Sequence, residues 1–476
     1  MRHAARSHQA LPQGIACRGF QGRIGTEAAS LLTGRGTTAV DTPSPASPED
    51  AARRLLISLR NPTRLLVAIS GGSDSTGLLV SLKQALADCA ISHNLVAATV
   101  DHALRPGSSD EARAVARLCA SLGIPHRILT WHGAKPTTGI SAAAREARYR
   151  LLADAAADFG ATAIVTGHTA DDQDETITMR AARAEDDNLG LSGMAEAMLY
   201  DRRIWVLRPF LSVRREAIRA YLYATRLGWI DDPSNTDRRY ERVRVRQDRG
   251  TATRPLGVEA AERRRRLSRH AAELIAHCAT LHAGCLIALA PDALDAEPAI
   301  LRHALATLVA VAGGRPHRPG TAAMDRLIDF VASGSPGRMT LARTLVQRRR
   351  DGLYLMRELR DVLPRQIPPH ASMLWDGRFR VTNRTGQVLQ VEPRSEPLPS
   401  SVVGVLPPSM QRHIARISPQ ILTVGGMETG ADETSIQAMV EPVFPLFDLF
   451  LAETDLTLAD GVARLFGRKA YLPPPA

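Results

Sequence analysis

Paired cysteines and long apolar runs are both missing from this chain. Its five cysteines form no Cys-x-x-Cys pair, which argues against a disulfide scaffold, a zinc ribbon and a paired-cysteine redox site. They are Cys17, Cys89, Cys119, Cys278 and Cys285. No run approaches the roughly 18 apolar residues of a membrane-spanning helix. The N-terminus lacks the apolar segment of a secretory signal, so we expect a cytoplasmic protein with no membrane partner.

Lysine is also scarce, and arginine carries almost all of the positive charge. The chain has three lysines against 57 arginines, and its net charge is +11. Residues 201–270 hold 19 arginines against 9 acidic residues, so most of the positive excess lies in this span. A guanidinium binds phosphate through paired hydrogen bonds. The charge therefore predicts a polyanionic partner.

The 476 residues divide into four predicted parts. Residues 1–50 end in the Pro/Ser linker 42–48 and are interpreted as a disordered extension, or as the product of a start codon placed too far upstream. An arginine-rich targeting presequence is the alternative for this part. Residues 51–210 alternate apolar runs with helix-like segments, residues 211–290 look helical and basic, and residues 291–476 mix helical and strand-like pieces.

Residues 51–210 predict an α/β fold. Apolar runs lie at 64–69, 94–100, 126–129, 161–166 and 204–207, and helix-like segments lie near 74–88, 109–122, 141–159 and 171–184. The first two runs are about 30 residues apart, as in a βαβ unit. Continuous apolar runs indicate strands covered on both faces, hence a parallel sheet. Ligands of such sheets bind beyond the carboxyl ends of the strands.

The strongest motif follows the first apolar run. It consists of Ser70, Gly71, Gly72, Ser73, Asp74 and Ser75. Two glycines allow a tight turn, and the helix that follows directs backbone N–H groups and its positive end toward an anion. The serines add hydroxyl donors, and Asp74 can hold magnesium against phosphates. The plainer interpretation is a glycine turn with a capping serine, but the motif resembles the SGGxDS loop of the ATP pyrophosphatases.

A second motif, GHTADDQDET, follows the fourth run. It delivers His168 and four acids, Asp171, Asp172, Asp174 and Glu175, to the same edge of the sheet. Asp171 and Glu175 are four residues apart and share a helix face. Acids beside a polyphosphate indicate either magnesium or a clamp for an ammonium substrate. Taken alone, His168 could equally be a capping or core histidine.

Arginines form three further groups. Arg145 and Arg148 are three apart on one predicted helix and can reach a single anion. Arg242, Arg244 and Arg246 alternate, and residues 263–266 are a run of four. A solvated charged face is the plainer interpretation of these groups. For the run we expect ordinary surface or contact with an RNA backbone rather than catalysis.

Several more segments specify a family. These are Asp101–Arg105, Ala144–Tyr149, Gly190–Met194, Arg208–Phe210 and Trp229 followed by Asp232–Asn235. With the two motifs above, they resemble the tRNA(Ile)-lysidine synthase family over about residues 60–246, and weakly at Trp375–Phe379. Four places depart from the family pattern: Ser141, Val243, residues 184–187, where a glycine-rich turn is usual, and the stretch after Arg246, which lacks the expected proline-terminated segment.

The resemblance implies a Rossmann-like ATP pyrophosphatase domain, a basic tRNA-contacting helical region and a mixed C-terminal region that recognises tRNA. It implies transfer of L-lysine to the wobble cytidine of isoleucine tRNA with a CAU anticodon, using ATP and Mg²⁺. The residues implied are Asp74, His168, Asp172 and Glu175 for catalysis, Ser70–Ser75 and Arg145 for ATP, Asp74 and Asp172 for magnesium, and Arg242 and Arg246 for tRNA.

Three other functions stay open at this point. A tRNA thiolase could use the same domain, although sulfur insertion needs a reactive cysteine or an iron–sulfur cluster. Cys89 and Cys119 fall within or at the end of predicted helices instead. An RNA-binding relic would need neither the loop nor the acids, and an amidotransferase-type synthetase would need a glutaminase nucleophile.

Overall fold

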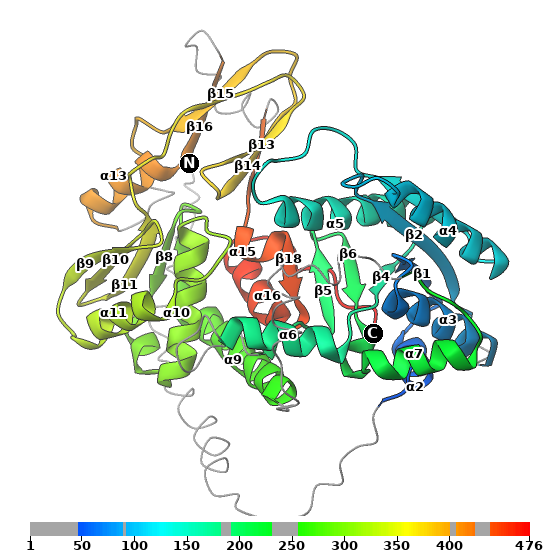
Figure 1. Ribbon diagram of the computed structural model, residues 1–476. Coiled ribbons are helices and arrows are strands. Elements are labelled where there is room, and N and C mark those ends of the chain that lie inside the picture. Colours follow the sequence, from blue (N-terminus) through cyan, green and yellow to red (C-terminus); the bar gives the residue numbers. More distant parts are fainter. Residues whose placement is uncertain (1–45, 89–91, 182–191, 231–255, 400–405, 424–437) are drawn as a thin grey trace, which may run out of the picture. The chain divides into compact units, whose positions relative to one another are not determined.

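The five predicted apolar runs belong to a seven-stranded sheet (Figure 1), six of whose strands lie in the first half of the chain. The computed structural model describes residues 46–88, 92–181, 192–230, 256–399, 406–423 and 438–476. Five strands match the runs: β1 (Arg64–Ala68), β2 (Asn94–Asp101), β3 (His126–Thr130), β4 (Ala163–Thr166) and β6 (Ile204–Leu207). All five run parallel to their neighbours in this set, which confirms the α/β prediction.

Helices cover both faces of this sheet. The predicted helices are α3 (Ser73–Asp88), α4 (Ser108–Ser121), α5 (Ile140–Phe159) and α6 (Ala170–Ala181). The strand order is β4-β1-β2-β3. Helix α3 connects β1 to β2 and α4 connects β2 to β3, and α5 then crosses back to β4 on the other side of β1. Because such crossovers are right-handed, α5 lies on the opposite face from α3 and α4. One core forms there, where Tyr149 and Leu152 of α5 pack on Leu66, Ile164 and Val206.

The order of the strands also places the two predicted motifs side by side. Strand β1 pairs with β2 on one side and with β4 on the other, so the direction of winding reverses between β1 and β4. The glycine loop follows β1, and the segment GHTADDQDET follows β4. Ligands of open α/β sheets bind at such a reversal.

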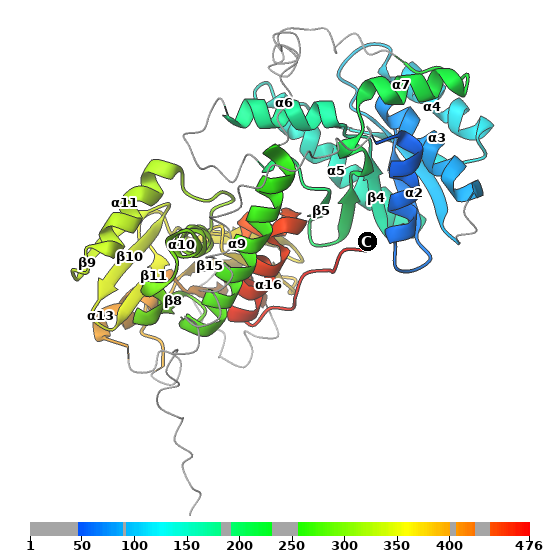
Figure 2. The same cartoon turned by 90° about the horizontal axis from the view of Figure 1, so that it is seen from below.

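Two short strands were not predicted. Strand β5 (Ala197–Tyr200) pairs antiparallel with β6, and β18 (Phe450–Ala452) pairs antiparallel with β5. The segment after α16 (Leu456–Leu465) also runs back to this domain (Figure 2). There Trp205 Nε1 donates to the carbonyl of Leu472 at 3.0 Å. Part of the region 291–476 that was predicted to be separate therefore belongs to the first sheet.

The basic region is helical only as far as Cys278, so the prediction of helix up to residue 290 is wrong. It contains α7 (Arg215–Ala224) and α9 (Leu256–Cys278), and then strands β7 (Ala279–His282) and β8 (Leu286–Leu289). Ala283 and Gly284 have φ of +50° and +63°, which end the helical pattern in a tight turn. Cys285 lies in this turn and not on the apolar face of α9.

The sequence places a capping candidate, Ser212, and an acid, Glu216, near the start of α7. Ser212 does not cap this helix, because it ends the 3₁₀ helix η3 (Pro209–Ser212) and Arg214 precedes the first helical residue. Glu216 lies in the first turn of α7.

The remaining elements form the C-terminal part. Strands β7 and β8 begin a five-stranded antiparallel sheet with β11 (Gly352–Arg357), β10 (Thr344–Arg349) and β9 (Gly337–Leu341). Two three-stranded sheets follow, made of β12 (Arg365–Ile367), β15 (Leu389–Pro393) and β16 (Pro419–Thr423), and of β13 (Ser372–Trp375), β14 (Phe379–Asn383) and β17 (Ala438–Pro442). The helices of this part are η5 (Pro291–Asp295), α10 (Pro298–Ala312), α11 (Thr321–Ala332), α13 (Pro408–Ile417), α15 (Pro445–Asp448), η6 (Glu453–Asp455) and α16 (Leu456–Leu465). Helix α2 (Pro48–Ser58) instead packs against α3 in the first domain.

The segment Trp375–Phe379 has a structural role. Asp376, whose side chain is 1% exposed, accepts hydrogen bonds from Arg378 Nε at 2.7 Å and Arg357 Nη2 at 3.1 Å, and Arg343 also donates to it. Buried charges persist only where they are paired in this way. The segment therefore ties the turn between β13 and β14 to β11 of the five-stranded sheet, which is a structural role.

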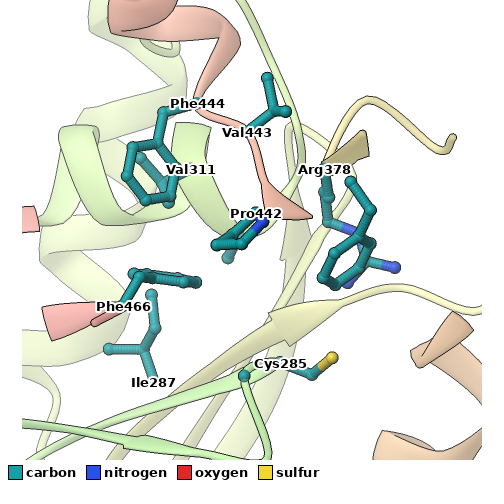
Figure 3. A pocket seen from close by; sticks show the side chains of 11 residues that line it. Cys285, Ile287, Val311, Arg378, Pro442, Val443, Phe444 and Phe466 are labelled. Carbon is teal, nitrogen blue, oxygen red and sulfur yellow. The ribbon is translucent and has the colours of Figure 1, made fainter. Parts of the chain in front are cut away.

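A small cavity lies beside Arg378, and Figure 3 shows it. Phe444 and Phe466 line one side, with Arg378 opposite and Cys285 and Ile287 below. Its volume is about 20 Å³, which is room for about one water molecule. The cavity is thus a packing defect and not a substrate site.

No helix in the described part of the chain is long and apolar enough to cross a membrane.

The arginine run 263–266 is not the free surface that we expected. Arg264 binds both carboxylate oxygens of the buried Asp455, at 2.9 and 2.7 Å, and Arg265 pairs with Glu453 at 3.0 Å. Helix α9 lies beside α16, and α16 begins directly after these two acids (Figure 2). Two of the four arginines therefore hold α9 to η6, through pairs of residues 188 and 191 positions apart.

Asp455 also accepts hydrogen bonds from Arg318 at 3.2 Å and Ser268 at 3.0 Å. Burial alone would raise the pKa of Asp455, but Arg318 and Arg264 outweigh it and hold the pKa far below the usual range. The carboxylate is thus ionised at neutral pH, and Arg264 and Arg318 depend on it for neutralisation.

We expect Asp455→Asn to lower the free energy of unfolding by about 3–5 kcal/mol, because it leaves two largely buried guanidinium groups without a counter-charge. Glu453→Gln, which breaks a half-exposed pair, is the control and should cost less than about 1 kcal/mol. Urea denaturation at pH 7 measures both. Since the folded pKa is depressed, the gap between parent and Asp455→Asn should close as pH falls below the unfolded pKa of about 3.9. Equal losses in the two variants would contradict this role.

Candidate active site

The glycine loop is built to hold an anion at the end of β1. Gly71 has φ of +88°, and a Cβ there would lie 2.8 Å from Val115 Cγ2 and 2.9 Å from Ile230 Cδ1. The backbone N–H of Ser70 donates to Ser75 Oγ at 3.1 Å, which closes the loop around Gly72. Helix α3 then begins at Ser73, so its N-terminal N–H groups adjoin the loop.

Two other segments, around Gly167 and Ile230, contact this loop directly. A Cβ on Gly167 would lie 2.9 Å from the carbonyl carbon and oxygen of Asp74, so the segment after β4 touches the backbone at the start of α3. The backbone N–H of Ile230 donates to the carbonyl of Gly71 at 2.8 Å. Three segments that the sequence singled out, around residues 71, 167 and 229, therefore meet at one place.

Asp172 fixes the start of α6 and also faces the loop. Its Oδ2 accepts from the backbone N–H and from the Oγ1 of Thr169, both at 2.9 Å, while Thr169 Oγ1 accepts from the Asp172 N–H at 3.3 Å. This reciprocal arrangement is a capping box. It leaves Oδ1 of Asp172 directed toward Arg215, which donates to it at 3.3 Å.

Arg215 joins the two carboxylates that were predicted to hold magnesium. Its Nε donates to Asp74 Oδ2 at 2.9 Å, and its Nη2 donates to Asp172. Burial would lower the pKa of Arg215, but the Asp74 and Asp172 carboxylates outweigh it and raise that pKa. Asp74 and Asp172, from segments almost 100 residues apart, thus converge on one cation.

Sequence reasoning missed Arg215. A signal was present, because Arg214 and Arg215 stand at the beginning of α7, where the helix dipole disfavours positive charge. The acids of α6 explain this placement. Arg214 pairs with Asp174 at 2.7 Å, and the backbone N–H of Arg215 donates to Asp171 at 2.8 Å.

The other predicted catalytic residues have different surroundings. Glu175 is only 2% exposed on α6, so it lies in the interior beneath the acids described above. His168 Nδ1 lies 2.9 Å from Thr166 Oγ1, and that hydroxyl lies 3.5 Å from the carbonyl of Leu207. If Thr166 donates to Leu207, it accepts from Nδ1–H of His168, and Nε2 then carries the lone pair.

Arg145 rests on an aromatic surface at the side of the sheet. Its guanidinium carbon lies 5.0 Å from the ring centroid of Tyr149 and 5.8 Å from that of Phe450, which β18 supplies. The two rings meet edge to face at 5.5 Å. Burial would raise the pKa of Tyr149, but Arg208, Arg145 and Arg148 lower it to about 8. Arg242 and Arg246 lie outside the described residues.

The donors around the loop fit magnesium bound together with phosphates. Within the described residues no three His, Cys, Asp or Glu side chains converge into a site of their own for a metal. Mg²⁺ commonly uses one or two carboxylates and takes its other ligands from substrate phosphates and water. Asp74 and Asp172, already gathered on one cation beside an anion loop, match that need.

Known proteins are similar in sequence to this chain. The PP-loop domain family matches residues 48–250. A tRNA(Ile)-lysidine synthase of Rhizobium meliloti (strain 1021) is 44% identical over 439 residues, which cover 90% of this chain and 96% of that protein. The chain belongs to the tRNA(Ile)-lysidine synthase family.

Other relatives agree with this assignment. The tRNA(Ile)-lysidine synthase of Mesorhizobium japonicum is 41% identical over 440 residues, covering 88% of this chain and 95% of that protein. That of Brucella canis is 35% identical over 436 residues, covering 85% and 94%. Membership in the tRNA(Ile)-lysidine synthase family makes the chain an enzyme of this kind and sets aside the thiolase, relic and amidotransferase alternatives.

A solved thiolase shows much less similarity. The U34-tRNA thiolase NcsA from Methanococcus maripaludis, with its [4Fe-4S] cluster, gives a TM-score of 0.36 at 17% identity, covering 42% of this chain and 70% of that one. That likeness is too slight to bear on activity.

The described cysteines of this lysidine synthase family member are all buried. Burial raises the pKa of Cys119 on α4 to about 11, and Cys285 Sγ lies 3.3 Å from Ser418 Oγ. Cys278 is also buried. A thiol of raised pKa is a poor nucleophile at neutral pH.

We therefore expect a variant with all five cysteines changed to Ser or Ala to modify tRNA as fast per folded molecule as the parent does. Its Tm should fall, because three of the changes lie in packed positions. Rates normalised to the folded fraction make the comparison. Loss of activity in a folded single-cysteine variant would contradict a reaction that needs no thiolate.

Proposed function

We propose that the protein ligates L-lysine to C2 of the wobble cytidine of isoleucine tRNA with a CAU anticodon, consuming ATP and releasing AMP and pyrophosphate. The observation that carries the proposal is the convergence of Asp74 and Asp172 on Arg215 beside the glycine loop. Family membership supplies the reaction class, and the geometry supplies the groups that would serve it.

In the first step the cytidine O2 attacks the α-phosphate of ATP and pyrophosphate leaves. Ser70, Ser73 and the N–H groups at the start of α3 would bind the phosphates, as helix N-termini with glycine loops do. Mg²⁺, held by Asp74 and Asp172, would neutralise charge on the departing pyrophosphate. The work of the protein is positioning and electrostatic stabilisation rather than covalent catalysis.

In the second step the lysine ε-amine attacks C2 and expels AMP. The acids of α6 give this part of the site negative charge that suits an ammonium group. The amine must lose protons to attack and to form the product. His168, held through Nδ1 by Thr166, would accept a proton at Nε2.

Arg145 is proposed to bind ATP, and Arg242 and Arg246 to contact tRNA. The exposed position of Arg145 over Tyr149 and Phe450 leaves its guanidinium accessible to an anion. Residues 211–290 and the C-terminal region 291–476 are proposed to hold the tRNA. Residues 211–290 hold 16 arginines against 9 acidic residues, and this excess supports the role of the first of these regions.

Product analysis tests the chemistry of the proposal. With ATP, lysine and isoleucine tRNA, we expect one AMP and one pyrophosphate for each lysine incorporated. Omission of tRNA is the control and should abolish both products. Formation of ADP and inorganic phosphate instead would contradict attack at the α-phosphate.

A further inference from the structure

Phe450 comes from the last part of the chain but packs on the core of the first domain. Its strand, β18, pairs with β5 so that Phe450 stands opposite Tyr200. The centroid of the Phe450 ring lies 5.4 Å from that of Tyr200 and 5.5 Å from that of Tyr149 on α5. Phe450 is therefore part of the surface against which α5 packs.

Both ends of β18 are fastened, which fixes the position of Phe450. Just before the strand, the backbone N–H of Asp201 donates to the carbonyl of Leu449 at 2.9 Å. Just after it, Glu453 pairs with Arg265 of α9 at 3.0 Å. Phe450 itself is half-buried. A half-buried ring on a strand held at both ends is a rigid support for a neighbouring side chain.

The side chain that this ring supports is Arg145. The guanidinium carbon of Arg145 lies 5.8 Å from the centroid of the Phe450 ring and 5.0 Å from that of the Tyr149 ring. An arginine at such a distance from the face of a ring is attracted by the negative charge of that face. Among the described residues no carboxylate pairs with Arg145, so the two rings are what orients its guanidinium.

Arg145 lies near the edge of the sheet where ATP would bind. Helix α5 leads from β3 to β4, so its first turns adjoin the carboxyl ends of these parallel strands, and Arg145 stands in its second turn. Arg148 follows one turn later on the same face. Burial lowers the pKa of His102, directly after β2, and the charge of Arg148 lowers it further. This arginine face of α5 therefore acts on the carboxyl edge.

We propose that Phe450 is a positioning residue for the reaction, because its ring holds the Arg145 guanidinium where it can bind a phosphate of ATP. This role rests on the proposed function, in which Arg145 binds ATP. It also means that the C-terminal region completes the ATP site, through a strand whose partner lies about 250 positions earlier in the chain.

The test uses two variants of the full chain. Phe450→Leu keeps an apolar side chain on β18 but removes the ring, whereas Phe450→Tyr keeps the ring. The matched control is Phe159→Leu, since Phe159 packs on the same core and carries Arg127 at 4.6 Å at the other end of α5. Initial rates of pyrophosphate release at varied ATP, with lysine and isoleucine tRNA present, give kcat and KM per folded molecule.

We expect Phe450→Leu to raise KM for ATP by about 3- to 10-fold with little change in kcat, since it weakens a binding contact of Arg145. Phe450→Tyr should restore KM to within about 2-fold of the parent, because it restores the ring face. Phe159→Leu should lower Tm about as much as Phe450→Leu does and leave KM unchanged. The difference in KM would then report the support of Arg145 and not a loss of packing.

A double-mutant cycle with Arg145→Gln shows whether Phe450 acts through Arg145. Arg145→Gln alone should raise KM for ATP, and adding Phe450→Leu should raise it no further. A parental KM in Phe450→Leu, or an equal added loss in the Arg145→Gln background, would overturn the positioning role and leave the proposed function standing. A parental KM in Arg145→Gln would instead refute ATP binding by Arg145, and the positioning role with it.

Discussion

Asp74→Asn should lower the rate of pyrophosphate release by about 10²- to 10³-fold or more, the usual effect of removing one electrostatic group from a charge-stabilising site. The asparagine keeps the shape of the side chain but removes the negative charge that faces Arg215 at 2.9 Å. If Asp74 holds magnesium against ATP, the loss should appear in kcat and should be partly relieved by higher magnesium. Single-turnover assays of pyrophosphate release measure both.

The matched control is Asp88→Asn. Asp88 is exposed at the other end of the same helix, α3, so the change removes an equal charge without touching the loop. It should retain the parental rate. Near-parental turnover in Asp74→Asn, at any magnesium concentration, would show that the glycine loop does not bind the reacting phosphates as proposed.

Arg215→Gln should have the second-largest effect, about 10²-fold on kcat/KM for ATP, because Asp74 and Asp172 would then repel each other and the incoming phosphates. Arg215→Lys should recover only part of this loss, since an ammonium cannot bridge two carboxylates as the guanidinium fork does. Initial rates at varied ATP concentration separate KM from kcat.

Arg203→Gln serves as the control for this change. It breaks an exposed pair with Asp154 at 3.3 Å on the turn before β6 and should leave the kinetics unaltered. If Arg215→Gln kept the parental KM and kcat, Arg215 would be a structural tie between α7 and α6 only.

The parallel part of the fold was predictable because its signals are local. Each of the five predicted runs became a strand of the parallel part of the sheet, and the segments after β1 and β4 lie at its carboxyl edge. The loop 70–75 and the acids of α6 also followed from sequence, since strand, turn and helix lie in one continuous segment. Their convergence could be expected from the rule for parallel sheets.

Long-range pairings were not predictable in this way. Strand β18 has three residues and meets β5 across about 250 positions, and no local pattern signals that partner. The arginine run 263–266 looked like solvated surface because Asp455 and Glu453, which bind half of it, lie far along the chain. Arg215 escaped notice for the same reason, since its two carboxylates come from other segments.

Lysine transfer to two tRNAs that share one anticodon tests the central claim most directly. Enzyme, ATP and radiolabelled lysine are incubated separately with unmodified isoleucine tRNA bearing CAU and with methionine tRNA bearing the same anticodon. The account predicts ATP-dependent label on the isoleucine tRNA, located at the wobble cytidine after nuclease digestion, and none on the methionine tRNA. No label on the isoleucine tRNA, or equal label on both, would contradict it.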